Sequence, residues 1–342
     1  MQKCRSTESI LASSDMDVAK MRAFKKQTVD LVVYFIVRLI ICVVQAMPVK
    51  ACDQLAWFLA FVAADVFKIR AKLIDDNLEK VFPLTTGLSR KQTSRAMWRH
   101  LCMMVFEIAH APRKIHETNW RDFVSIKSKR EVVKYLLMER PKALVSGHFG
   151  NFEIGGFVTG LIGFPGYTVA RKMDNPYLDR WVKSFREEHG QYILDTVGSS
   201  AAIQEQLERN QCLVLLGDQH TELGAVWVDF LGRQAACHKS LAVFTLSCDS
   251  PMLVVYTKRV SKFDNSRSSE PMKFEIGCQG IADPDQLPDE INGVRDLTIW
   301  YNQILGEIIL KNPEQYWWVH NRWKPKPDRK KKAAIMSKRK AA

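Results

Sequence analysis

A histidine and a glutamate five residues apart, His148 and Glu153, are the side chains of this sequence best suited to acid–base chemistry. A neutral imidazole can take a proton from a hydroxyl near neutral pH, and a carboxylate on its other ring nitrogen fixes the tautomer and stabilises the imidazolium that forms. The sequence has no Gly-x-Ser-x-Gly motif to present a serine nucleophile. We therefore expect His148 to activate a hydroxyl of the substrate, with Glu153 orienting it.

The same two side chains also have a purely structural interpretation. A histidine can cap a helix, and a glutamate in the first turn of a helix interacts favourably with the helix dipole. A pattern of two fixed positions is a hypothesis until its structural context supports it. The residues around the pair therefore decide between the two interpretations.

The sequence around the pair predicts a strand, a turn and a helix. A short apolar run at 143–145 ends in Ser146-Gly147, and a second apolar stretch occupies 154–161. The pair is thus expected at the C-terminal end of a strand and in the first turn of a helix. Gly150 and Asn151 lie between, and their backbone N–H groups are expected to stabilise an oxyanion. The structural alternatives are a tight turn at Gly150 and a helix N-cap at Asn151.

From Lys142 onward, strand and helix patterns alternate along the chain. The predicted strands are 143–146, 167–170, 192–194, 213–216 and 252–256. The predicted helices are 177–188, 200–209, 239–248 and 294–310, and an amphipathic helix at 89–109 precedes them. This alternation predicts an α/β fold with a mainly parallel central sheet flanked by helices.

Two further polar residues follow predicted strands. Ligands of α/β sheets bind beyond the carboxyl ends of the strands, where Arg171 and Asp218 are expected. Arg171 is suited to binding a lipid phosphate or stabilising an oxyanion, and the alternative is a surface ion pair with Asp174 or Asp179. Asp218 is expected to orient Arg171 or a substrate hydroxyl, and the alternative is capping of the turn that follows.

Several blocks of this sequence resemble one known family. The segment 143–153 is similar to the His-x4-Asp/Glu motif of the glycerolipid and lipid A acyltransferase superfamily. Other blocks resemble the late acyltransferases of lipid A biosynthesis, the lauroyl and myristoyl transferase group. These blocks are Ala170–Asp179 followed by Arg186 and Gly190, Leu215–Gln219 continuing to Gly224, Val228–Gly232, Gln315–Lys324 and Asp76–Pro83. The resemblance extends from about Val29 to Lys324, nearly the whole chain.

The resemblance implies a membrane-associated O-acyltransferase on the cytoplasmic face of the bacterial inner membrane. It implies an acyl carrier protein or acyl-CoA as thioester donor and a membrane glycolipid, a lipid A precursor, as acceptor. Neither a metal nor another cofactor nor a covalent acyl-enzyme is implied. The implied catalytic residues are His148, Glu153, Arg171 and Asp218, and the implied oxyanion or substrate-binding residues are Gly150, Asn151, Asn175, Gln219 and Arg322. The alternatives are acylation of a glycerophospholipid or aminolipid, and a basic binding protein without catalysis.

The chain departs from the family pattern by its extension before Val29, by its basic tail after Lys324, and at three places between them. Phe152 stands where tryptophan is usual, His320-Asn321-Arg322 stands for His-Arg-Arg or a near variant, and His220 stands where an acidic residue is common. These differences leave the reaction class in place. They leave the acceptor and the acyl chain open.

Charge points to an anionic partner. The net charge is +13 and the sequence pI is about 9.3, which suits a membrane surface, a lipid phosphate, an acidic carrier protein or nucleic acid. No recognised nucleic-acid motif is present, so we expect no nucleic-acid partner. Lys172, Lys183 and Arg186 are candidates for docking an acidic carrier, and a solvated helix face is the alternative. The eight cysteines are scattered singly, which predicts neither a disulfide framework nor a zinc site.

A strongly apolar stretch, Val29–Met47, follows a basic cluster at 20–26. Arg38 near its middle costs about 2.5–3.5 kcal/mol on the membrane-insertion scale. A single span, a helix lying in one leaflet and a buried core helix are the three interpretations, and we expect membrane anchoring. Three tryptophans near the end of the chain, Trp317, Trp318 and Trp323, suit a membrane interface, with core packing of at least one as the alternative.

Five regions follow from these patterns. They are a polar, basic and disordered extension at 1–28, a membrane-anchoring helix at 29–49, a helical region at 50–140, an α/β acyltransferase core at 141–324 and a basic tail at 325–342.

Overall fold

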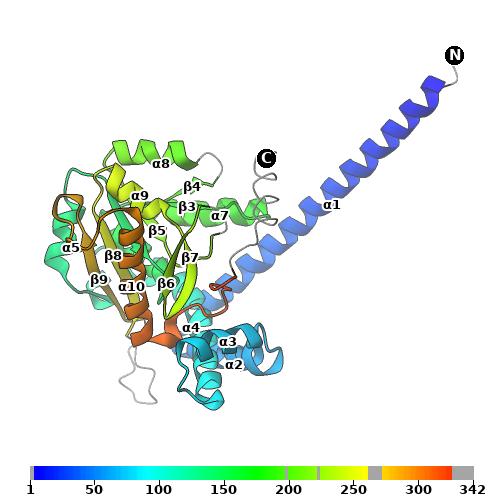
Figure 1. The fold of residues 1–342 in the computed structure, drawn as a ribbon. Helices are drawn as coiled ribbons and strands as arrows, with labels where there is room; N and C mark the ends of the chain where they lie inside the picture. Colours follow the sequence, from blue (N-terminus) through cyan, green and yellow to red (C-terminus); the bar gives the residue numbers. More distant parts are fainter. Residues whose placement is uncertain (1–3, 197–198, 222–223, 261–271, 326–342) are drawn as a thin grey trace.

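A twisted seven-stranded sheet forms the centre of the molecule (Figure 1). The computed structural model describes residues 4–196, 199–221, 224–260 and 272–325. The strand order is β1-β9-β8-β2-β5-β3-β4, and every neighbouring pair is parallel except β8 with β9. The bounds are β1 Val124–Ile126, β2 Lys142–Ser146, β3 Gly166–Ala170, β4 Gln191–Asp195, β5 Cys212–Leu216, β8 Met252–Arg259 and β9 Phe274–Ala282. The predicted mainly parallel α/β sheet is confirmed.

Helices cover both faces of this sheet, and a short hairpin stands beside it. The helices of the body are α2 Val49–Phe61, α3 Ala71–Val81, α4 Gly87–Lys114, α5 Lys129–Leu136, α6 Phe152–Leu161, α7 Pro176–Glu187, α8 Ser199–Glu208, α9 Ser240–Ser247 and α10 Val294–Lys311. The π-helical turn η1 spans Val62–Val66 and the 3-10 turn η4 spans Pro313–Gln315. The hairpin strands are β6 Val226–Phe230 and β7 Arg233–Cys237, which pair antiparallel.

Two large hydrophobic clusters hold most of these layers together. One joins α3, the β6–β7 hairpin, α9 and α10 to the sheet, with Trp318 and Tyr301 at its centre. The other joins α2, α4 and α6, with Met103 and Ile154 fully buried. The sheet is therefore packed on both faces, as a mainly parallel sheet requires.

Strand β9 was not predicted from the sequence. It carries Gly277 and Gly280, and glycine is uncommon in strands. A Cβ at Gly280 would lie 2.4 Å from Cδ1 of Ile304 and 3.0 Å from the Trp300 ring. The glycine thus allows α10 to pack closely on the sheet, a tertiary requirement that the local pattern does not reveal.

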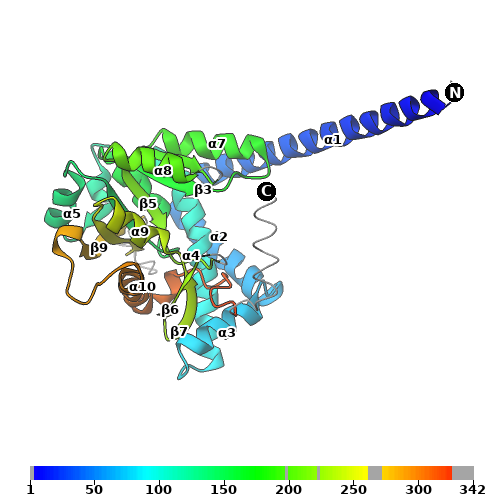
Figure 2. The same cartoon turned by 45° about the horizontal axis from the view of Figure 1, so that its top comes forward.

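Helix α1, Cys4–Ala46, extends away from the body in both views (Figures 1 and 2). Its segment Phe24–Ala46 is long and apolar enough to cross a membrane, with a mean hydropathy of 2.3 and 6% of the apolar window buried. The helix already begins at Cys4, inside the segment predicted to be disordered. The basic tail predicted at 325–342 lies outside the described residues, apart from Pro325.

A buried ion pair fixes the turn between β2 and α6. The carboxylate of Glu107 in α4 is fully buried. It accepts hydrogen bonds from Arg259 Nε at 2.5 Å and from Arg259 Nη2 at 2.6 Å. The same carboxylate accepts Asn151 Nδ2 at 2.8 Å. Arg259 Nη1 lies 2.5 Å from His100 Nδ1, and His100 Nε2 lies 3.2 Å from the Gly150 carbonyl oxygen. One network therefore connects α4, β8 and the turn.

Burial and the neighbouring Arg259 guanidinium hold the pKa of His100 well below its ordinary value. The neutral ring with its proton on Nε2 fits both contacts, since Arg259 then donates to Nδ1 and His100 donates to Gly150. His100 therefore stays uncharged while the protein is folded.

Removing the Glu107 carboxylate should strongly destabilise the fold. Glu107→Ala leaves the Arg259 guanidinium buried without its anion, and breaking a buried pair in this way costs about 3–5 kcal/mol. Thermal or denaturant unfolding of the detergent-solubilised protein measures the loss, with Glu117→Ala on the exposed surface as the control. A loss below about 1 kcal/mol, the scale of exposed pairs, would contradict a structural role for this pair.

Acid should weaken the fold in a way that depends on His100. Below about pH 6.5 the unfolded histidine binds a proton that the folded one does not, so stability falls as the pH falls through that range. The slope contributed by one such group approaches about 1.4 kcal/mol per pH unit. We expect His100→Gln, whose amide preserves both contacts, to flatten the decline between about pH 6.5 and 5. Unfolding curves measured across this range give the two slopes, and equal slopes would refute the assignment.

Candidate active site

His148 and Asp218 meet at the carboxyl ends of two neighbouring strands. Strands β2 and β5 pair in parallel with Ser146 opposite Leu216, so the residues that follow them lie side by side. His148 Nδ1 lies 2.8 Å from Asp218 Oδ1, and the backbone N–H of His148 donates to Asp218 Oδ2, also at 2.8 Å. Both carboxylate oxygens of Asp218 are therefore engaged by one residue.

The environment keeps Asp218 ionised. The residue is only 2% exposed, and burial by itself raises the pKa of its carboxyl. The two hydrogen bonds from His148, the attraction of its ring whenever the ring is protonated, and a smaller contribution from Arg322 outweigh burial, so the pKa of Asp218 is lowered. A buried anion on Nδ1 holds the ring with that nitrogen protonated.

The other ring nitrogen faces an amide. Gln219 Nε2 lies 3.1 Å from His148 Nε2, and with Nδ1 protonated toward Asp218 the amide is the donor. The ring lies between two aromatic side chains, with centroid distances of 5.3 Å to Phe152 and 4.6 Å to Trp317. The Trp317 backbone N–H also donates to the His148 carbonyl oxygen at 3.2 Å. The lone pair on His148 Nε2 therefore accepts a hydrogen bond from the side-chain amide of Gln219.

Glu153 does not contact His148 as the sequence led us to expect. It lies in the first turn of α6, as predicted, but it faces α7 and forms an ion pair with Arg186. Arg186, a candidate for carrier docking, is therefore engaged within the fold. The position on Nδ1 is taken by Asp218, which is 70 residues away in sequence. A left-handed residue, Gly150 with φ +59°, separates the histidine from the helix and turns the glutamate to the other side.

The two backbone N–H groups expected to form an oxyanion site are already engaged. Gly150 N–H donates to the Gln315 carbonyl at 2.9 Å, and Asn151 N–H donates to the Thr257 carbonyl at 2.9 Å. A Cβ at Gly150 would lie 1.8 Å from that Thr257 oxygen, so only glycine fits the turn. Asn151 caps α6 by accepting Ile154 N–H at 3.3 Å. Both N–H groups therefore have backbone partners in this structure, and the two residues form the tight turn and the N-cap that were the structural alternatives.

Arg171 lies on the surface, and Asn175 caps helix α7. The Arg171 side chain is 82% exposed and pairs with Asp174 at 3.5 Å, the surface alternative considered for it. Asn175 is the N-cap of α7 and accepts two backbone N–H groups of its first turn, at 3.0 and 3.2 Å. Its side-chain amide donates to the Asp30 carbonyl in α1 at 2.7 Å.

Arg322 is a buried structural residue close to Asp218. It is 1% exposed, donates to the Ala236 carbonyl at 2.8 Å and lies 2.7 Å from the Cys237 sulfur. Trp318 and Trp323, predicted for a membrane interface, are also buried, at 1% and 9% exposure. Core packing, the alternative considered for at least one tryptophan, applies to both.

Comparisons with known proteins show similarity to one group of enzymes along most of the chain. The family model described as bacterial lipid A biosynthesis acyltransferase matches residues 21–325. A lipid A biosynthesis lauroyltransferase of Escherichia coli K12 is 24% identical over 295 residues, covering 84% of this chain and 90% of the relative. A lipid A biosynthesis acyltransferase of Haemophilus influenzae is 25% identical over 264 residues, covering 76% and 79%. A lipid A biosynthesis palmitoleoyltransferase of Escherichia coli K12 is 22% identical over 271 residues, covering 78% and 82%.

Proposed function

Because the chain belongs to the bacterial lipid A biosynthesis acyltransferase family, we propose that it moves a fatty acyl group from a thioester donor to a hydroxyl of a lipid A precursor. Acyl carrier protein is the proposed donor, and acyl-CoA is the alternative. The observation that carries the chemistry is the buried Asp218–His148 pair, which leaves Nε2 as a proton acceptor at the end of β2.

In the proposed reaction, His148 Nε2 takes the proton of the acceptor hydroxyl as its oxygen attacks the thioester carbonyl carbon. The carbon–sulfur bond then breaks, and the departing thiolate receives the proton from the imidazolium. Asp218 stabilises the imidazolium between these two transfers, because its carboxylate is ionised, buried and 2.8 Å from Nδ1.

Gln219 is proposed to mark the place of the acceptor hydroxyl. Its amide occupies the hydrogen-bonding position on His148 Nε2 at 3.1 Å, where a substrate donor must lie for its proton to be removed. When the hydroxyl takes this position, the amide N–H groups are released. They then become donors for the oxyanion that forms on the thioester carbonyl.

Arg171 and Glu153 keep proposed roles outside this pair. The exposed guanidinium of Arg171 follows β3, a neighbour of β5, and is available to a phosphate of the lipid. Glu153 is proposed to act through Arg186, by holding α7 against α6 beside the His148 turn.

The proposed location is the cytoplasmic face of the bacterial inner membrane. The support is the apolar segment Phe24–Ala46 of α1, which is 6% buried, and the basic charge of the chain. An active site anchored in this way meets a lipid acceptor at the membrane surface, where an acidic carrier can reach it from the aqueous side.

Loss of Asp218 should resemble loss of His148. General-base catalysis contributes about 10²–10⁴-fold, so His148→Ala and Asp218→Asn should each lower kcat in that range with near-normal melting. The double variant should be little worse than either one, because the two residues act as a unit. Acyl transfer from a thioester to purified lipid A precursor in detergent measures kcat and KM, with the exposed Asp289→Asn as the control. Turnover by Asp218→Asn at the rate of the unchanged protein would remove the pair from this mechanism.

The variant Glu153→Gln distinguishes the role of the Glu153 carboxylate from that of the Asp218 carboxylate. We expect a smaller loss of kcat than for Asp218→Asn, since Glu153 contacts Arg186 and not the imidazole. The same acyl-transfer assay measures both variants. A loss as large as that of Asp218→Asn, with normal melting, would return Glu153 to the role of partner of His148.

Carrier docking can be tested at Lys172 and Lys183, which are exposed and paired with Asp195 at 3.0 Å and Glu187 at 3.7 Å. The double change to glutamate should raise the KM for carrier-bound donor and leave the KM for acyl-CoA unchanged. The effect should fade with salt, because exposed charges are screened over about 8 Å at physiological ionic strength. Lys127→Glu with Lys129→Glu is the matched control, and an unchanged carrier KM would place docking elsewhere.

A further inference from the structure

Helix α2 packs with its small residues inward and its large apolar residues outward. Cys52, Ala56 and Ala60 are fully buried in the face that packs on α4. Trp57 and Phe58 point the other way and are 50% and 61% exposed. An amphipathic helix of a protein surrounded only by water shows the opposite pattern, with its large apolar residues inside.

The same outward surface continues beyond the helix. Four more large apolar side chains are 43–71% exposed, namely Phe61 at the end of α2, Val66 in η1, and Phe67 and Ile69 in the loop that follows. Single exposed apolar side chains are ordinary, but a continuous group of them marks an interaction surface. We call the stretch from Trp57 to Lys72 the α2–η1 surface.

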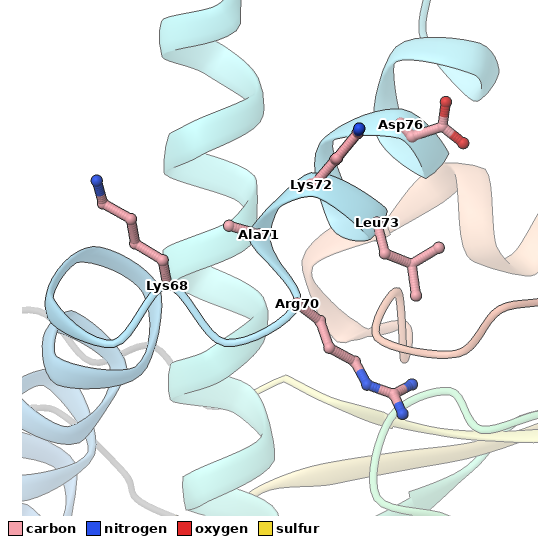
Figure 3. Close-up of a pocket in the computed structure, with 6 residues that line it drawn as sticks. All are labelled: Lys68, Arg70, Ala71, Lys72, Leu73 and Asp76. Atoms are coloured by element: carbon pink, nitrogen blue, oxygen red, sulfur yellow. The ribbon is translucent and has the colours of Figure 1, made fainter.

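Positive charge borders this surface. Lys68, Arg70 and Lys72 are exposed and line a hollow of about 640 Å³ together with Ala71, Leu73 and Asp76. Figure 3 shows Lys68 and Lys72 extending to the same side of the chain, one on either side of Ala71.

The other charged residues of the hollow are engaged. Arg70 extends the opposite way in Figure 3 and donates to the Val319 carbonyl at 2.7 Å. Asp76, the acidic residue that lines the hollow, pairs with Lys80 at 2.5 Å. Lys68 and Lys72 are therefore the cations placed to meet an anion beside the apolar side chains.

The chain also connects this surface to the apolar helix. Helix α1 ends at Ala46 and α2 begins at Val49, with Pro48 at its N-cap. The apolar segment of α1 and the outward face of α2 are therefore consecutive in the sequence. A bilayer that receives α1 is the occupant that matches both the apolar side chains and the lysines.

We propose that the α2–η1 surface is a second membrane contact. Its aromatic side chains enter the boundary of the acyl chains, and Lys68 and Lys72 pair with phosphates of anionic lipid headgroups. This contact goes beyond anchoring by α1, and it rests on the proposed membrane association. It gives the body of the protein its own contact with the bilayer, in addition to the apolar segment of α1.

Photo-crosslinking of the full-length protein tests this contact. The protein is reconstituted in vesicles whose lipids carry a photoreactive group in the acyl chain, and crosslinked peptides are mapped by mass spectrometry. We expect crosslinks in α1 and in residues 57–72. Changing Phe58, Phe61 and Phe67 to serine should reduce the second set severalfold and leave the first unchanged. Serine at the scattered exposed residues Leu137, Tyr192 and Leu310 is the matched control.

The lysines are tested by lipid charge. Crosslinking at 57–72 should increase when phosphatidylcholine vesicles contain phosphatidic acid, and Lys68→Gln with Lys72→Gln should abolish the increase. Lys127→Gln with Lys129→Gln, which removes the same charge elsewhere, should not. Crosslinks confined to α1 would overturn the second contact and leave the membrane association standing. Burial of the α2–η1 surface by another copy of the chain would give this result. Absence of crosslinks in α1 as well overturns the membrane association itself.

Discussion

The buried Glu107–Arg259 pair is the contact on which the geometry of the site depends. Arg259 ends β8, Glu107 lies in α4, and the pair binds Asn151 and, through His100, the carbonyl of Gly150. A buried charge that has lost its partner is costly, so each member of the network holds the others in place. The turn after β2 is therefore held by contacts from both α4 and β8, and these contacts position the imidazole.

A second constraint comes from the pairing of β2 with β5. Parallel register places the residues after Ser146 and Leu216 at the same edge of the sheet. Gly147 stands where a Cβ would lie 3.2 Å from Asp218 Oδ2, so the histidine backbone can approach the carboxylate closely. The imidazole and its anion are thus positioned by two neighbouring strands of the central sheet, and Phe152 and Trp317 pack against the ring.

The local sequence pattern was enough to predict the strands that carry the site residues. Apolar runs bounded by small residues identified β2, β3, β5 and β8, and with them the strand ends at His148, Arg171 and Asp218. Family resemblance supplied the reaction class. Neither gave the partner of His148, because a spacing of five residues favoured Glu153, whereas the contact with Asp218 depends on strand order. The engagement of Gly150 and Asn151 N–H by the backbone of residues 315 and 257 also arises only in the assembled fold.

Helix α7 gives the arrangement a mechanical consequence. Asn175 holds it to α1, Arg38 of α1 stacks on Trp181, and Arg186 holds its far end to Glu153 of α6. At the end of α7, the chain comes so close to α6 that a Cβ at Gly160 would lie 1.8 Å from the His189 carbonyl. Helix α1 is therefore attached to the body through its contacts with α7. A displacement of α1 would therefore act first on α7 and, through the Arg186–Glu153 pair, on the helix that begins beside the imidazole.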